Sequence, residues 1–192
     1  MASPINKIIL VVPPKYRGRP EGQRDSAACG KPWTLPAIVT VTDYRVDIPK
    51  EHYQILNFRQ DDLPGVAVIN SALKTFEPKI VFRWHLSIML DFEDLIDNRM
   101  PSKREREIID EYENLLDKEV KGPDKTKPNA LFLARITWNK THELIWRVYD
   151  AERVHKYLQQ IISNGSSPRP FDYRIDPDDK WKLAEWHLKD WT

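Results

Sequence analysis

Hydrophobic and polar residues alternate with a period of two along parts of this chain. From residue 80 to residue 92 every even position is apolar, and polar side chains such as Arg83 and His85 lie between them. Successive side chains of a strand point to opposite faces of a sheet, so this period gathers the apolar residues on one face. We therefore predict a half-buried strand over 80–92. The same alternation predicts a strand over 171–175.

Two other segments carry apolar residues at the spacing of an α-helix. We predict helices over 102–120 and 151–164, each with one apolar face. Ser102, with Glu105 three residues later, is typical of a capping box at the start of the first helix. Asp150 is a favoured N-cap residue for the second helix.

Between these helices, the β-rich runs 131–138 and 144–149 flank the turn residues 139–142, which indicates a hairpin. Residues 80–175 then follow the order strand, helix, strand, strand, helix, strand. This order is typical of the ferredoxin-like split βαβ unit. We predict an α+β fold in which the four strands form one antiparallel sheet and both helices cover one face of it.

The remaining segments extend this core. β-rich runs at 38–44, 53–58 and 66–70 predict extra strands before it. Asp176-Pro177 favours the start of a final helix after it. The residues expected on one face of that helix are Trp181, Ala184, Leu188 and Trp191.

The first part of the chain differs in composition from the rest. Residues 1–36 hold six of the 15 prolines, with six basic residues against two acidic ones. We predict a basic, Pro/Gly-rich arm over 1–36 and a single α+β domain over 37–192. The apolar run 8–12 is too short for a signal-peptide core or a membrane span, so we expect a soluble, cytoplasmic protein and no membrane partner.

The overall charge is close to balanced, with 30 Lys and Arg against 29 Asp and Glu. A dedicated nucleic-acid binder usually carries a clear basic excess, so this balance argues against nucleic acid as a partner. A single cysteine, Cys29, excludes an internal disulfide and a zinc site built on several thiolates. The glycines match no phosphate-binding loop and no two histidines stand four residues apart, so we expect no cofactor and no metal.

Two histidine positions raise the question of catalysis. His85 lies in the middle of a predicted strand, where it is either a general base on an open sheet face or a hydrogen-bonded structural residue. His142 and Glu143, in the predicted hairpin, are either an acid–base pair or solvated turn residues. A small hydrolase that uses His85 with nearby carboxylates is therefore one alternative function. RNA binding through the basic arm is another.

Carboxylates gather where the long predicted strand ends, at Asp91, Glu93, Asp94 and Asp97. Such groups can bind a divalent cation or perform acid–base chemistry, but this set lacks the glycine and the regular spacing of a calcium loop. The set is either a solvated loop or an acidic docking patch for a protein partner. In the second case Trp84, or another exposed aromatic residue, would supply the buried anchor that charges rarely provide.

Six short blocks of the sequence resemble a bacterial family of domains of unknown function, number 695, over about residues 45–192. The blocks are Pro64–Leu73, Phe82–Leu86, Asn98–Ser102, Ala134–Trp138, Trp146–Asp150 and Asp176–Trp181. The chain departs from the family pattern at Arg99, where the resemblance implies a glycine, and residues 1–44 lie outside the match.

The resemblance also implies a relation to the regulator of ribonuclease activity B, which has a ferredoxin-like fold and acts by binding a ribonuclease without catalysis of its own. It supplies no catalytic residues. We therefore expect a non-enzymatic protein-binding module that inhibits or regulates a partner protein. A bacterial toxin-immunity protein and a ribonuclease regulator both fit this expectation.

Overall fold

The computed structural model describes residues 44–191 of the chain. The strands are β1 (Tyr53–Gln60), β2 (Leu63–Asn70), β3 (Trp84–Asp91), β4 (Ala130–Trp138), β5 (Thr141–Val148) and β6 (Phe171–Pro177). The helices are α1 (Lys103–Lys121), α2 (Ala151–Asn164) and α3 (Glu185–Leu188), with short 3-10 helices at Ser71–Thr75 and Lys79–Phe82. The predicted arm at 1–36 and all of the predicted strand 38–44 except Tyr44 lie outside the described residues.

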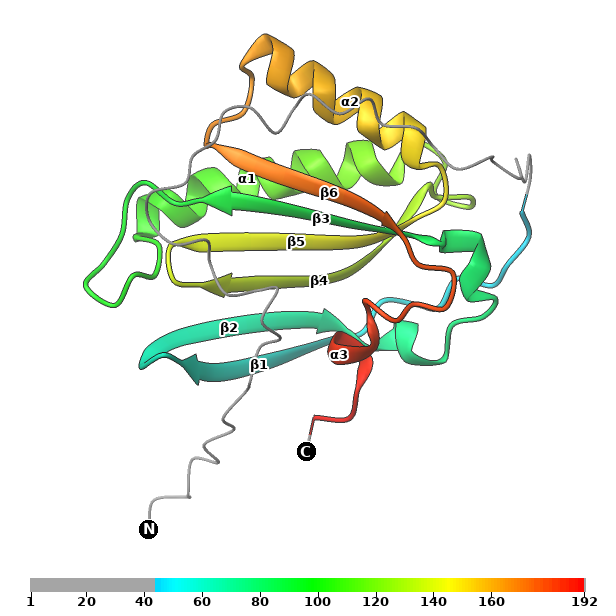
Figure 1. The fold of residues 1–192 in the computed structure, drawn as a ribbon, viewed down its shortest axis with the longest axis horizontal. Coiled ribbons are helices and arrows are strands. Elements are labelled where there is room, and N and C mark those ends of the chain that lie inside the picture. The colour runs from blue at the N-terminus through cyan, green and yellow to red at the C-terminus, as the bar shows by residue number, and fades with distance from the viewer. Residues whose placement is uncertain (1–43, 192) are drawn as a thin grey trace.

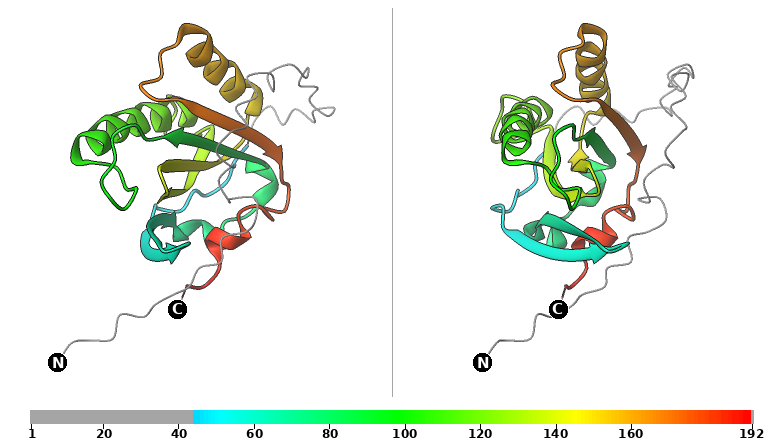
Figure 2. Two further views of the ribbon diagram at one scale, coloured as in Figure 1. Left: turned by 60° about the vertical axis from the view of Figure 1, so that its left-hand side comes forward. Right: turned by 90° about the vertical axis from the view of Figure 1, so that its left-hand side faces the viewer.

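The six strands form one antiparallel sheet in the order β1-β2-β4-β5-β3-β6 (Figure 1). The four strands predicted over 80–175 correspond to β3, β4, β5 and β6, and they are neighbours in this sheet. A mixed fold of helices and an antiparallel sheet is therefore confirmed. The sheet is strongly curved, so that β1 and β2 turn toward the C-terminal segment (Figure 2).

Both long helices pack on the same face of the sheet. The even-numbered apolar residues of β3, from Trp84 to Leu90, lie in one core cluster with residues of α1 and α2. Leu116 of α1, Trp146 of β5 and Leu158 of α2 have no exposed surface in this cluster. The period of two along β3 and the helical period along α1 and α2 therefore meet in a single apolar layer.

A second core cluster covers the opposite face of the sheet. Trp181 and Ala184 pack there with Phe58 of β1 and Ile69 of β2. Figure 2 shows the C-terminal segment inside the curve made by these two strands. The register of β4 shifts at a bulge between Phe132 and Ala134. For this reason Leu131 before the bulge and Ile136 after it both face the second cluster, although one position is odd and the other even.

The prediction of a strand over 80–92 is wrong at both ends. β3 spans Trp84–Asp91, and the residues before it form the 3-10 helix Lys79–Phe82. This turn places Phe82 in the second cluster, whereas Trp84 lies in the first. The apolar alternation of the sequence continues through this turn, although a 3-10 helix has three residues per turn and Ile80 is exposed there, so the alternation alone did not mark the start of the strand.

The prediction of a long C-terminal helix is also wrong. Asp176 and Pro177 end β6 instead of opening a helix, and only Glu185–Leu188 is α-helical. Trp181 has a φ of 57°, a left-handed conformation that a continuous helix does not allow. Its indole N–H donates to the carbonyls of Lys79 and Phe82, at 2.9 and 3.0 Å, which fixes the chain in this turn.

Candidate functional site

The four carboxylates singled out in the sequence lie at one end of the sheet. Asp91 is the last residue of β3, and Glu93, Asp94 and Asp97 follow it in the loop that leads to α1. All four residues are exposed. We refer to these four residues as the acidic loop. Figure 1 shows this loop beside the turn between β4 and β5.

Backbone hydrogen bonds give the acidic loop a defined shape. Ile96 N–H donates to the carbonyl of Met100 at 2.9 Å, and Arg99 N–H donates to the carbonyl of Ile96 at 2.9 Å. Arg99 has a φ of 62°, so this turn needs a left-handed residue where the resemblance implied glycine. The Ser102 hydroxyl donates to Asp94, which ties the loop to the N-terminus of α1.

An ion pair between a buried carboxylate and a partly exposed arginine lies beneath the acidic loop. Glu105 has no exposed surface, and its two carboxylate oxygens accept bonds from Nε and Nη2 of Arg169, both at 2.7 Å. Glu105 also accepts from the backbone N–H of Glu93 at 3.1 Å. The bonds from Arg169 hold the pKa of Glu105 below its ordinary value, although burial acts in the opposite direction.

The capping box predicted at Ser102 and Glu105 is therefore only half formed. Ser102 Oγ accepts from the backbone N–H of Glu105 at 3.1 Å, as predicted. The Glu105 carboxylate does not return to the N-cap backbone, because Ser102 N–H donates to the carbonyl of Asp94 and the carboxylate binds Arg169 and Glu93. Glu105 thus connects α1, the acidic loop and the segment before β6.

The acidic surface does not extend evenly onto α1. Exposed basic residues occupy its first turns, at Lys103, Arg104 and Arg106. Exposed Glu107, Asp110 and Glu111 follow them. The negative charge of the acidic loop is offset in part by exposed Arg99 within the loop and by Arg169, whose Nη1 lies 3.5 Å from Oε2 of Glu93.

Trp84 does not have the position expected for an exposed anchor. Its side chain belongs to the first core cluster, and only 8% of its surface is exposed. The expectation that Trp84 presents an aromatic ring to a partner is wrong. The alternation along β3 already placed Trp84 among the apolar residues of one face, which is the signal that points to burial.

His85 faces the second core cluster rather than an open sheet surface. It is 4% exposed, and its Nδ1 lies 3.2 Å from Nη1 of Arg147. Arg147 in turn donates to the carboxylate of Asp178 at 2.9 Å. His85 therefore belongs to a buried network around Arg147, and this burial removes the premise of a base on an open face.

Sequence reasoning missed a second polar cluster, beside α1. Glu113 Oε2 lies 3.2 Å from Nε2 of His142, and Thr137 Oγ1 lies 2.8 Å from Nδ1 of the same ring. Arg135 donates to both oxygens of Glu113 at 3.1 Å. Burial alone would raise the pKa of Glu113, but the interactions with His142 and Arg135 outweigh it and leave the pKa below its ordinary value.

His142 and Glu143 do not form an acid–base pair. As neighbours on β5 they face opposite sides of the sheet, so that His142 reaches Glu113 while Glu143 accepts from the Ser87 hydroxyl at 2.6 Å. The alternation of a strand could have predicted this separation had the strand been placed at 141–148 rather than 144–149.

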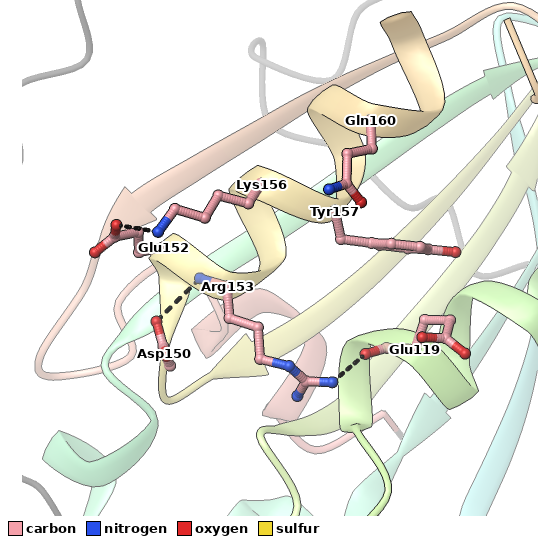
Figure 3. Close-up of a pocket in the computed structure, with 7 residues that line it drawn as sticks. All are labelled: Glu119, Asp150, Glu152, Arg153, Lys156, Tyr157 and Gln160. Carbon is pink, nitrogen blue, oxygen red and sulfur yellow. Dashed lines mark hydrogen bonds and ion pairs between the residues drawn. The ribbon is translucent and has the colours of Figure 1, made fainter. Parts of the chain in front are cut away.

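Two hollows lie between α1 and α2, away from the acidic loop. Figure 3 shows the larger one, of about 510 Å³. Its charged groups bond one another, since Arg153 donates to the carbonyl of Glu119 at 3.2 Å and Lys156 lies 2.6 Å from Glu152. A second hollow of about 330 Å³, lined by Tyr112 and Leu115 among others, adjoins it. Neither hollow brings together the polar clusters described above.

Among residues 44–191, no three His, Cys, Asp or Glu side chains are grouped closely enough to hold a metal ion. None of the helices in this part of the chain is both long and apolar enough to cross a bilayer.

Comparison with known protein families adds one finding. The profile of a family described as "Family of unknown function (DUF695)" matches residues 53–186, from the start of β1 into α3. No match was found among curated proteins or among solved structures.

Proposed function

The chain belongs to the DUF695 family, and from its surface we propose that it is a non-catalytic protein-binding module that inhibits or regulates a partner protein. The single observation that supports this function is the exposure of Asp91, Glu93, Asp94 and Asp97 on one structured loop. The loop is held by its own backbone bonds and by the pair of buried Glu105 and Arg169, so the carboxylates are presented in a fixed arrangement.

A fixed group of carboxylates suits a partner with a basic surface. Proteins that cleave nucleic acid need such a surface, because phosphate contacts dominate their affinity for substrate. Complementary charge accelerates the encounter of two proteins and selects the correct partner. We therefore propose a basic protein as the partner, in the class of nucleic-acid-cleaving toxins or ribonucleases.

We extend the proposal to the more specific properties that were expected from the sequence. They are a role as a toxin-immunity protein or ribonuclease regulator and a bacterial source, which the resemblance suggests, and a cytoplasmic location, which is expected from the short apolar run 8–12. We also propose that β3 to β6 with α1 and α2 form a ferredoxin-like split βαβ unit. The strand order β6-β3-β5-β4 and the packing of both helices on one face support this assignment.

A hydrolase is the second candidate, and one observation favours it. Thr137, His142 and Glu113 connect a hydroxyl, an imidazole and a carboxylate in the order of a nucleophile relay. His85, the base considered from the sequence, is instead buried against Arg147. A turnover that disappears in Thr137→Val while the fold persists would favour the enzyme over the binding module.

Affinity capture with paired charge-reversal variants tests the proposal. The full chain is immobilised and exposed to an extract of its native host, and stoichiometric partners are identified. The first variant replaces Asp91, Glu93 and Asp97 by Lys, and leaves Asp94 in place because it bonds to Ser102.

The matched control reverses an equal number of exposed carboxylates elsewhere, at Asp47, Glu77 and Glu185. We expect a stoichiometric protein that binds the wild type and the control but not the acidic-loop variant. Equal capture by all three proteins would show that the acidic loop does not bind the partner. Absence of any stoichiometric partner would contradict the proposed function itself.

A further inference from the structure

β1 lies at one edge of the sheet. Among the described residues it pairs with β2 alone, and the register runs without a shift from Tyr53 opposite Asn70 to Gln60 opposite Leu63. The strand has eight residues and contains no proline. Natural proteins usually protect a sheet edge with prolines, bulges, inward-pointing charges or a covering segment, because free backbone groups invite pairing with another strand.

The hydrogen-bond pattern shows which backbone groups face the edge. Ser71 N–H donates to the carbonyl of His52 at 2.8 Å, so the backbone N–H and C=O of His52 point toward β2. In an antiparallel pair these groups alternate in direction along the strand. The N–H and C=O groups of Tyr53, Ile55, Asn57 and Arg59 therefore point away from β2, in the plane of the sheet.

The same edge carries the most exposed large hydrophobic residue of the described chain. Ile55 is 68% exposed and Tyr53 is 43% exposed. The ring centroid of Tyr53 lies 6.2 Å from that of Phe132, which belongs to the first core cluster, so Tyr53 is on the face of the sheet that α1 covers. Ile55 is two positions along the strand and therefore lies on the same face. An apolar side chain at the centre of an edge with which no other described strand pairs is the feature that strand addition would bury.

We propose that β1 pairs antiparallel with β1 of a second copy of this chain, which joins two sheets into one across a two-fold axis. Such an interface requires a strand that is complementary to itself. With Ile55 opposite Ile55, the two most exposed apolar side chains cover each other, and Tyr53 lies opposite Asn57 on either side of the axis. In this register every residue of β1 whose backbone groups face the edge lies opposite another such residue, so the two strands can form a complete set of hydrogen bonds.

Charge also fits a second copy. Arg59 is the only charged residue of β1, and Glu51 lies just before the strand. In the register centred on Ile55, Arg59 of each copy lies opposite Glu51 of the other. The Glu51 carboxylate already accepts from Lys121 Nζ at 3.0 Å and from the Tyr53 hydroxyl at 2.8 Å in its own copy, and Arg59 would add a second cation beside it. No like charges lie directly opposite each other in this register, which is the condition that an interface between identical strands must satisfy.

The test is the mass of the full chain in solution, measured by sedimentation over a wide range of protein concentration. We expect a monomer–dimer equilibrium for the wild type. Ile55→Lys should raise the dimer dissociation constant about tenfold or more, because two like charges then face each other at the axis. The matched control is Ile162→Lys on α2, where the replaced side chain is 46% exposed, and it should leave the equilibrium unchanged.

A second variant, Asn57→Pro, removes an N–H that faces the edge and is not used in the pairing with β2, so it should also abolish the dimer while circular dichroism stays native. Disulfide formation by Ile55→Cys in a Cys29→Ser background, and not by Ile162→Cys, would support the two-fold axis at Ile55. A wild type that is monomeric at every concentration overturns the proposal. A dimer that survives both Ile55→Lys and Asn57→Pro overturns it as well, because that dimer must use another surface.

Discussion

Arg147 of β5 and Asp178, the residue that follows β6, form a buried ion pair that attaches the C-terminal segment to the sheet. Nη1 of Arg147 donates to the Asp178 carboxylate at 2.9 Å and Nη2 donates to the Asp178 carbonyl at 2.8 Å. The Arg147 side chain has no exposed surface, and its Cζ lies 4.8 Å from the centroid of the Trp181 ring. Burial lowers the pKa of Arg147 to about 10, although Asp178 acts to raise it.

Asp178→Ala should lower the free energy of unfolding by about 3–5 kcal/mol, because it leaves the buried guanidinium of Arg147 without a counter-charge. The neighbouring Asp179→Ala is the control, since its pair with Arg83 is exposed and should contribute only about 0–1 kcal/mol. Urea denaturation of both variants measures the difference. Similar losses in the two variants would show that Asp178 has no special role in holding the C-terminal segment.

The pair of Glu105 and Arg169 predicts a pH-dependent stability. Because the pKa of Glu105 is held below its ordinary value of 4.5, the pair stabilises the fold above that value. This contribution is lost as the pH falls through the lowered pKa of the folded state. Arg169→Gln should therefore cost about 3 kcal/mol near neutral pH and progressively less in acid.

Urea midpoints measured as a function of pH test this prediction. Lys103→Gln is the control, because Lys103 lies 3.9 Å from Glu107 on the exposed face of α1. The control should leave the pH profile unchanged. A loss of stability in Arg169→Gln that is the same at all pH values would contradict the assigned role of Glu105.

The resemblance implied glycine at the position of Arg99. The φ of 62° at this residue explains a preference for glycine, because glycine adopts a left-handed conformation without steric cost. A left-handed conformation costs a non-glycine residue about 1–2 kcal/mol. Arg99→Gly removes this cost but gives up the bond from the guanidinium to Asn139, so its stability should stay within about 1 kcal/mol of the wild type, on the stabilising side. Arg99→Val should instead destabilise the protein by about 1–2 kcal/mol. Equal unfolding temperatures of the two variants would contradict the left-handed turn.

His85→Gln tests the structural role assigned to His85. The ring of His85 contacts Arg147 in the interior, so the substitution should lower stability by about 1–3 kcal/mol and leave capture of the partner intact. Urea denaturation measures the stability of the variant, and capture assays at a temperature at which it is folded measure its binding to the partner. A steady-state activity that vanishes in folded His85→Gln would overturn the proposed function.

Local patterns predicted those parts of the fold that depend on neighbouring residues. The helix over 151–164 matches α2, and the Asp150 side chain accepts from the backbone N–H of Arg153 at 3.1 Å as an N-cap should. The period of two predicts β3 but not where it begins, because the alternation of apolar residues in the sequence continues through the 3-10 turn before it, Lys79–Phe82. Trp181 has a left-handed conformation that interrupts the expected C-terminal helix. No local sequence pattern predicts it, because this conformation depends on bonds to carbonyls far away in the sequence.

The candidate site, like the fold, has features that local sequence patterns predict and contacts that they do not predict. Exposure of the acidic loop followed from its composition and its place after a strand, and all four carboxylates are exposed. The ion pair beneath it joins Glu105 to Arg169, which are 64 positions apart, so no local pattern could have predicted it. Glu113 and His142 likewise meet only because α1 packs over β5.

The proposal that the acidic loop binds a basic partner is tested most directly by the salt dependence of association. The rate constant for binding of the purified partner is measured at increasing ionic strength, for the wild type and for the variant with Lys at positions 91, 93 and 97. We predict that the wild-type rate falls as salt screens the charges, that the variant associates more slowly at low salt, and that the two curves converge at high salt. Identical rate constants at every salt concentration, in a variant shown to be folded, would contradict the proposal.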